Sequence, residues 1–244
     1  AGGGAGRMMA EWIIEGEPSL DIWPLDILRF GPHHKSRSYN VERTREIYGK
    51  HYTIHWPHEE HGSARGIRRS PLYFPLKEKG AVYGAKYGWE RANWFAPEGV
   101  APEDEHTFEI PKWFVHVAAE HKNARENVVL MDQSSFCKFE VEGVGALAFL
   151  NRLSANQIDR PIGKVIYTQM CNPRGTIECD LTIARLADDR FMLVVGTAFG
   201  KRAAWWLNHH LPADGSVAVQ EMTSAYGVIN VIGPRSRDLL QKLT

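Results

Sequence analysis

One stretch of alternating residues carries the side chains best suited to chemistry in this sequence. Between Thr176 and Leu186 the sequence reads TIECDLTIARL, and apolar side chains at every second position predict a strand with one buried face. Glu178 and Asp180 then lie on the opposite face, about 7 Å apart. Two carboxylates at that spacing can raise each other's pKa, which would suit one of them to proton transfer. The alternative is the wet face of an ordinary half-buried strand.

Histidines gather between His51 and His61, in HYTIHWPHEEH, but their pattern does not favour a metal site. His51 and His55 have the i, i+4 spacing that would place two ligands on one face of a helix. However, Pro57 breaks any helix through the group, and the spacing differs from the HExxH of zinc enzymes. No cysteine lies nearby, so we expect no metal ion.

Two further groups have a functional and a plainer interpretation. Arg65, Arg68 and Arg69 could hold a carboxylate or a phosphate, or they could form a solvated turn. Ser134 and Ser135 lie in DQSSF, which is not the GxSxG turn of a nucleophilic serine. We therefore expect no serine nucleophile.

The composition is that of an ordinary globular protein. The chain has 244 residues, of which 43% are hydrophobic, and its 29 basic side chains balance 29 acidic ones. Zero formal net charge gives no reason to expect nucleic acid as a partner. No apolar run approaches the roughly 20 residues that span a bilayer, so we expect no membrane partner either. Three cysteines without CxxC spacing favour a reducing compartment over a disulfide framework.

The elements that would position these side chains are clearest in the second half of the chain. Alternating strands, helical spacing and short turns predict an α+β fold with mostly antiparallel sheets and packed helices. The expected strands are 138–142, 165–171, 176–186, 190–195, 216–222 and 226–232, and the expected helices are 113–126, 146–153, 200–210 and 236–244. Before them, a region rich in Pro, Gly, His, Arg and aromatic residues with weak periodicity indicates a packed but irregular connector.

Both ends of the chain look like cuts in a longer protein. The sequence opens AGGGAGRMMAEWIIEG, which is not a signal peptide, and its last helical pattern runs to the final residue without a cap. Glycines before a helix can cradle a phosphate, but a dinucleotide fingerprint needs a preceding strand. A flexible tail is therefore the plainer interpretation of the first residues.

Several segments, taken in order, resemble one known enzyme family. They are DQSSFCKFEVEG, ALAFLNRLSANQ, YTQMCNPRGTIECDLTIARLADDRFMLVV and GVINVIGPRSRDLL. They are similar to the folate-binding half of dimethylglycine and sarcosine dehydrogenases, which in turn resembles the aminomethyltransferase (T-protein) of glycine cleavage. The resemblance implies that 1–31 is the tail of a flavin oxidoreductase domain and that 32–112 is the connector, or central domain, of that oxidoreductase. It further implies that 113–244 is the N-terminal part of the folate-binding domain.

This family joins two reactions, and the resemblance implies both. FAD takes a hydride from an N-methyl amine, and tetrahydrofolate captures the one-carbon unit before water hydrolyses the iminium to formaldehyde. The implied cofactors are thus FAD and tetrahydrofolate, and the implied substrate is a small N-methyl amine; the electron acceptor stays open. The implied location is the cytoplasm of a bacterium or the mitochondrial matrix of a eukaryote.

The resemblance also assigns roles to particular residues. In the family's G-x-I-x-x-D-L pattern the catalytic aspartate falls on Asp180, which would accept a proton from folate. The expected folate-binding residues are Tyr167, Asp180, Met192 and Val194. The T-protein has an acidic residue directly before this aspartate, whereas Cys179 stands here, so a paired carboxylate does not carry over.

By the same resemblance, the glycine-rich opening matches a segment that closes over the flavin, and its expected flavin contacts are Gly3, Gly4 and Gly6.

A non-catalytic relative, similar to the regulatory subunit of pyruvate dehydrogenase phosphatase, is the main alternative to an enzyme. A stand-alone aminomethyltransferase is less consistent with the sequence, because such a protein has no use for a flavin tail and connector.

Overall fold

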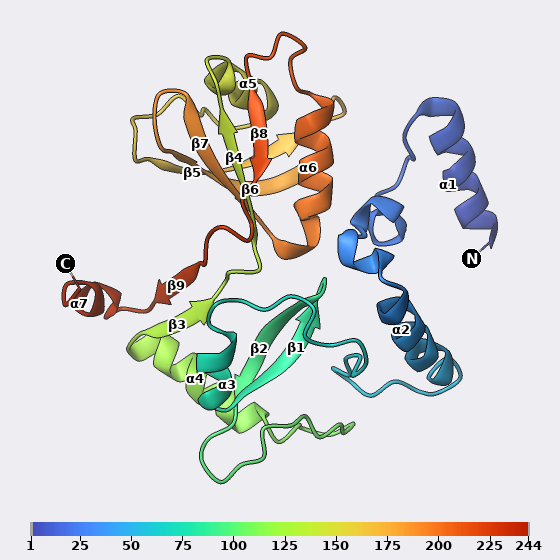
Figure 1. The fold of residues 1–244 in the computed structure, drawn as a ribbon, viewed down its shortest axis with the longest axis vertical. Helices are drawn as coiled ribbons and strands as arrows, with labels where there is room; N and C mark the ends of the chain where they lie inside the picture. Colours follow the sequence, from blue (N-terminus) through green and yellow to red (C-terminus); the bar gives the residue numbers. More distant parts are fainter. Residues whose placement is uncertain (1, 244) are drawn as a thin grey trace.

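The computed structural model describes residues 2–243 and divides into three regions (Figure 1). An N-terminal segment contains α1 (Gly2–Glu15), the short 3-10 helices η1 (Trp23–Leu25), η2 (Ile27–Arg29) and η3 (Pro32–Lys35), and α2 (Arg37–Gly49). A two-stranded hairpin with α3 (Tyr73–Glu78) follows. The third region contains the largest sheet and its covering helices.

The largest sheet has five strands in the order β5-β6-β7-β4-β8. Its strands are β4 (Cys137–Glu142), β5 (Val165–Cys171), β6 (Ile177–Arg185), β7 (Arg190–Val195) and β8 (Ala218–Glu221). Every pairing between its neighbours is antiparallel, and short turns join β5 to β6 and β6 to β7. Together with the helices, this sheet confirms the predicted α+β fold.

One face of the five-stranded sheet carries the main core. Ile183 and Leu193 are fully buried there and pack with Leu150 of α5 (Ala146–Leu153) and Leu207 of α6 (Gly200–His209). Because side chains alternate along a strand, the intervening residues of β5, β6 and β7 lie on the opposite face. Most of those residues are exposed or half-buried. This second face, which we call the open face, carries the predicted site residues.

A smaller sheet joins segments that are far apart in the sequence. The strand β3 (Val129–Asp132) pairs antiparallel with β9 (Ile229–Ile232), and the helices α4 (Phe114–Glu126) and α7 (Ser236–Leu240) flank this pair in the chain. The sequence predicted a strand at 226–232, which contains β9, but none at β3, because VLMD shows no alternation of apolar and polar residues.

The connector is irregular over long stretches and also contains a regular hairpin. The strands β1 (Ala81–Lys86) and β2 (Trp89–Phe95) pair across a two-residue turn. Both turn residues, Tyr87 and Gly88, have positive φ angles, of 50° and 80°, as the tightest hairpin turns require. No helix or strand occupies the histidine-rich stretch 51–61.

The N-terminal helix begins earlier than the sequence indicates. The sequence favours a flexible tail at the opening glycines, and this expectation is wrong, because α1 begins at Gly2. The glycines lower the helix propensity of its first turns but do not prevent the helix. Among the described residues, no helix has both the length and the apolar character needed to cross a membrane.

Candidate functional site

Asp180 and Tyr167 lie close together on the open face. In the β5–β6 pair, Gln169 is opposite Asp180 and Tyr167 is opposite Thr182. Tyr167 is therefore a diagonal neighbour of Asp180, within reach of a long side chain. The Asp180 carboxylate raises the pKa of the Tyr167 phenol above its ordinary value. The phenol thus stays protonated and can act as a hydrogen-bond donor on this face.

Val194 and Met192 extend the same face onto β7. Val194 is opposite Thr182 and Met192 is opposite Ala184, and both side chains are half-buried. Val194 is therefore one diagonal step from Asp180, and Met192 lies one further step along the sheet. The fold brings all four predicted folate-binding residues onto one surface, with polar groups at one end and apolar groups at the other.

The residue before Asp180 points the other way. Cys179 is 2% exposed and belongs to the main core. Burial raises the pKa of its thiol to about 12, so the thiol stays neutral. Cys179 therefore cannot substitute for the acidic residue that precedes the aspartate in the T-protein.

Glu178 departs from the simple alternation expected for this strand. The pairing of β5 with β6 shifts register between Met170 and Cys171, next to this position. The Glu178 carboxylate accepts hydrogen bonds from Nε and Nη2 of Arg202, at 3.0 and 2.7 Å, and from Asn172 at 2.9 Å. The Glu178 carboxylate is thus paired with Arg202 and Asn172, and its interaction with Asp180 stays a prediction.

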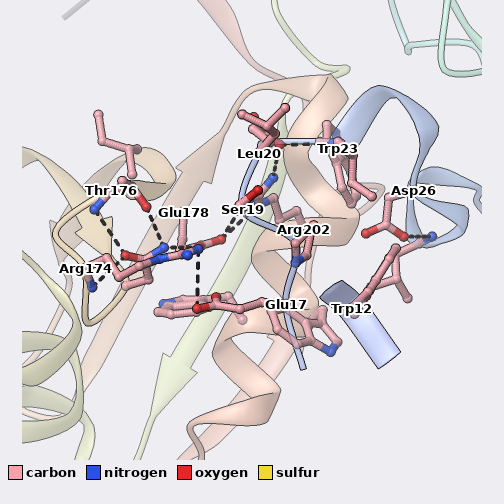
Figure 2. Close-up of a pocket in the computed structure, with 18 of the residues that line it drawn as sticks. Trp12, Glu17, Ser19, Leu20, Trp23, Asp26, Arg174, Thr176, Glu178 and Arg202 are labelled. Atoms are coloured by element: carbon pink, nitrogen blue, oxygen red, sulfur yellow. Dashed lines mark hydrogen bonds and ion pairs between the residues drawn. The ribbon is translucent and has the colours of Figure 1, made fainter. Parts of the chain in front are cut away.

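A pocket of about 430 Å³ lies beside this arginine (Figure 2). Its walls come from the N-terminal segment around Trp12 and Trp23, from the β5–β6 turn, and from α6. Arg202 and Glu178, which are joined by hydrogen bonds, both line this pocket (Figure 2). The lining reaches Ile177 and Glu178 but does not include Asp180, so this pocket and the open face are separate surfaces.

Lys138 is a polar residue of the open face that the sequence does not single out. It is opposite Val194 and is 2% exposed, and its Nζ donates to the Ser134 carbonyl oxygen at 2.8 Å. Burial lowers the pKa of this lysine. Only its position in the sheet identifies it, because an isolated lysine in a strand carries no sequence signal.

The other predicted groups are dispersed. Arg65 forms an ion pair with buried Glu90, with Nε and Oε1 3.0 Å apart, whereas the guanidinium of Arg68 lies 4.2 Å from the centre of the Trp89 ring. The three arginines therefore do not form one anion site. Across residues 2–243, no group of three or more His, Cys, Asp or Glu is arranged to hold a metal ion.

The antiparallel sheet, with helices on its core face and Asp180 on its open face, has the architecture of an aminomethyltransferase-like domain. The family model described as the GCVT N-terminal domain matches residues 72–244, and the chain belongs to this family. Residues 15–70 match the FAD dependent oxidoreductase central domain. The two matches confirm the resemblance seen in the sequence, of an oxidoreductase segment joined to an aminomethyltransferase-like domain.

Curated relatives share this arrangement along almost the whole chain. The 4-methylaminobutanoate oxidase (formaldehyde-forming) of Paenarthrobacter nicotinovorans is 40% identical over 99% of this chain. The mitochondrial pyruvate dehydrogenase phosphatase regulatory subunit of Mus musculus is 38% identical over 100% of it, and the mitochondrial dimethylglycine dehydrogenase of the same species is 33% identical over 99%. The chain spans only 28–29% of the length of these relatives.

A solved structure supports the fold of the sheet domain. The glycine cleavage system aminomethyltransferase T of Bartonella henselae superimposes with a TM-score of 0.59 at 25% sequence identity. The superposition covers 72% of this chain and 44% of that protein.

Proposed function

We propose that the protein containing this chain oxidises an N-methyl amine with a flavin and passes the one-carbon unit to tetrahydrofolate. In this proposal the chain supplies the folate-facing surface. The observation that carries it is the adjacency of Asp180, Tyr167 and Val194 on one open sheet face. Two relatives are named for dimethylglycine and 4-methylaminobutanoate, both of which are N-methyl amines, and these names support the substrate class.

The chemistry of the transfer needs a proton acceptor, and Asp180 is suited to that role. When a methylene group bridges two folate nitrogens, both nitrogens lose a hydrogen. One hydrogen leaves on the released amine, and the other leaves as a proton that a nearby carboxylate can accept. Asp180 is exposed on β6 and the Tyr167 phenol beside it stays protonated, so the carboxylate can receive a proton while the phenol donates a hydrogen bond.

The remaining folate contacts follow from the shape of the face. Val194 and Met192 are half-buried apolar side chains that could contact the flat pterin ring. Tyr167 is 62% exposed, which leaves its ring free to stack on the pterin or to hydrogen-bond it.

Flavin would carry out the oxidation when bound, and the only flavin contacts that we propose in this chain are three glycines of α1. Gly3, Gly4 and Gly6 are exposed residues of α1, and apart from the adjoining backbone of α1 no described atom lies within 4 Å of a Cβ placed on any of them. They form no cradle with the rest of residues 2–243. In the proposed protein these glycines would contact the flavin from the surface of α1.

The domain boundaries and the location belong to the same proposal. Residues 1–31 would end a flavin domain, 32–112 would form its connector, and 113–244 would begin the folate-binding domain. Two of the relatives above are mitochondrial proteins, which supports the mitochondrial matrix for a eukaryotic source. A bacterial source would place the protein in the cytoplasm.

The test uses the natural full-length protein that contains this chain. Purified protein should absorb in the flavin band and oxidise an N-methyl amine. Adding tetrahydrofolate should replace formaldehyde with methylenetetrahydrofolate as the product. A protein without flavin and without amine oxidation would contradict the proposal and favour a regulatory role, as in the phosphatase-subunit relative.

A further inference from the structure

We infer that Arg202 is a positioning residue that couples the N-terminal segment to the β5–β6 hairpin carrying Tyr167 and Asp180. This inference rests on the proposed function, because its readout is the fate of the one-carbon unit. Arg202 lies on α6, and its hydrogen bonds go to Glu178 and Asp21, not to Tyr167 or Asp180. The hydrogen bonds of Arg202 run in two directions, to Glu178 of β6 and to Asp21 of the N-terminal segment.

In one direction, Arg202 holds the start of the strand that carries Asp180. Its Nε and Nη2 both donate to one oxygen of Glu178, and the other oxygen of Glu178 accepts from Asn172. The side chain of Asn172 in turn accepts from the backbone N–H groups of Arg174 and Thr176, at 3.0 and 3.1 Å. Glu178 therefore ties α6 to the turn that joins β5 and β6.

In the other direction, Arg202 holds the N-terminal segment. Its Nη1 donates to Oδ1 of Asp21 at 3.0 Å, and its guanidinium lies 5.7 Å from the centre of the Trp23 ring. Trp23 is 5% exposed, and its indole N–H donates to the carbonyl oxygen of Ala198 at 3.3 Å. The same arginine therefore contacts both the segment and the sheet domain.

A second ion pair joins the N-terminal segment directly to the β5–β6 hairpin. Arg174, in the β5–β6 turn, forms an ion pair with Glu17 at 3.3 Å. Figure 2 shows both contacts on the border of the pocket, with Arg174 near Glu17 and Arg202 beside Glu178. A shift of residues 17–23 would thus displace the hairpin at two places, at Arg174 in its turn and at Glu178 near the start of β6.

Burial makes the Arg202–Glu178 ion pair stronger than the Arg174–Glu17 ion pair. The side chain of Arg202 is 19% exposed and that of Glu178 is 10% exposed, whereas Arg174 and Glu17 are each about half exposed. Ion pairs open to water contribute little, and partly buried pairs with several hydrogen bonds contribute more. On the side of the segment, the Asp21 partner of Arg202 is 69% exposed, whereas Trp23, whose ring lies 5.7 Å from the guanidinium, is 5% exposed. Arg202 therefore joins a buried ion pair of the hairpin to a buried side chain of the segment, and we expect the coupling to depend mainly on it.

The experiment measures how the full-length protein divides the one-carbon unit between formaldehyde and methylenetetrahydrofolate. Arg202→Ala should raise the ratio of formaldehyde to methylenetetrahydrofolate by about tenfold, within the range of effects seen along coupling networks. The rate of amine oxidation should change by less than about twofold, because the hydrogen bonds of Arg202 go to Glu178 and Asp21 and not to Gly3, Gly4 or Gly6. Arg202→Lys should restore part of the lost transfer, since it keeps the cation.

Two further variants make the test independent of folding. Asp21→Asn removes only one partner, and because the Asp21 side chain is 69% exposed, this variant should fold normally. It should raise the formaldehyde ratio in the same direction by a smaller factor. Lys201→Ala, on the same helix, removes an exposed ion pair with Glu221 and should leave the ratio unchanged.

Asp180→Asn separates failure of this inference from failure of the proposed function. If Asp180→Asn diverts product to formaldehyde while Arg202→Ala and Asp21→Asn do not, the coupling role is wrong and the proposed function stands. If Asp180→Asn itself diverts nothing, the proposed function fails. In the Asp180→Asn background the effect of Arg202→Ala should largely disappear, because both would act through one base. An additive effect would contradict the coupling role.

Discussion

Tyr167 and Asp180 are diagonal neighbours across the β5–β6 pair, and the charge of Asp180 raises the pKa of the Tyr167 phenol. Neither residue belongs to the main core. The local electrostatics of the open face therefore depend on two exposed side chains held in place by strand register.

This relationship predicts a shift in the titration of Tyr167. Replacing Asp180 with asparagine removes the negative charge that disfavours tyrosinate, so the pKa of Tyr167 should fall toward its ordinary value of about 10. The measurement is the pH dependence of the Tyr167 Cζ signal in carbon-13 NMR of labelled protein. Asp188→Asn, which alters a carboxylate in the next turn, is the matched control. An unshifted titration in Asp180→Asn would show that the two groups do not interact.

The break in alternation at the start of β6 predicts different effects of one substitution at two positions that simple alternation would place on the same face. Ile183 is fully buried and Ile177 is 60% exposed. Ile183→Ala should lower the free energy of unfolding by about 2–5 kcal/mol, because it leaves a cavity in the core. Ile177→Ala should change it by less than about 0.5 kcal/mol. Urea unfolding of both variants checks this, and equal losses would contradict the observed facing of the strand.

The buried ion pair of the connector predicts both a mutational and a pH effect. Glu90 is 6% exposed and accepts hydrogen bonds from Arg65 and from the backbone N–H of Gly66. Glu90→Gln leaves the Arg65 charge without its partner and should cost about 3 kcal/mol of stability. The double variant Arg65→Met with Glu90→Gln should cost less than the single one, which double-mutant unfolding measurements can check.

The pH dependence of this pair has a definite sign. Burial raises the pKa of the Glu90 carboxyl, but the hydrogen bonds from Arg65 and Gly66 outweigh burial and hold the pKa below its ordinary value of 4.5. A group with a lowered folded-state pKa stabilises the fold fully above its unfolded pKa. That contribution should therefore be present above about pH 4.5 and decline as the pH falls below it. Hydrogen exchange of residues 81–95 between pH 3 and 7 would detect the loss, and Glu90→Gln should flatten it.

Local pattern was enough to predict much of the sheet. The alternation of Cys179, Leu181 and Ile183 gave the buried face of β6 correctly, because period-two burial is a property of the strand itself. The same pattern placed Asp180 on the opposite face. It could not show what lies near Asp180, because the proximity of Tyr167 depends on the register between two strands.

Long-range contacts could not be predicted in this way. Arg202 and Glu178 are 24 positions apart, and nothing in either local sequence pairs them. The β1–β2 hairpin was missed because Gly84 and Ala85 weaken its alternation, so that only the turn at Gly88 remains as a signal. In both cases tertiary packing determines the structure, and it leaves no periodic pattern in the chain.

The central claim is that Asp180 is the base that lets folate capture the one-carbon unit. The most direct measurement is a single turnover of the full-length protein with a carbon-13 N-methyl amine and excess tetrahydrofolate. Asp180→Asn should reduce label transfer to folate by at least about a hundredfold, the usual contribution of a general base, and release the label as formaldehyde at an unchanged rate of amine oxidation. Asp188→Asn should behave as the wild type. Full label transfer by Asp180→Asn would contradict the assignment.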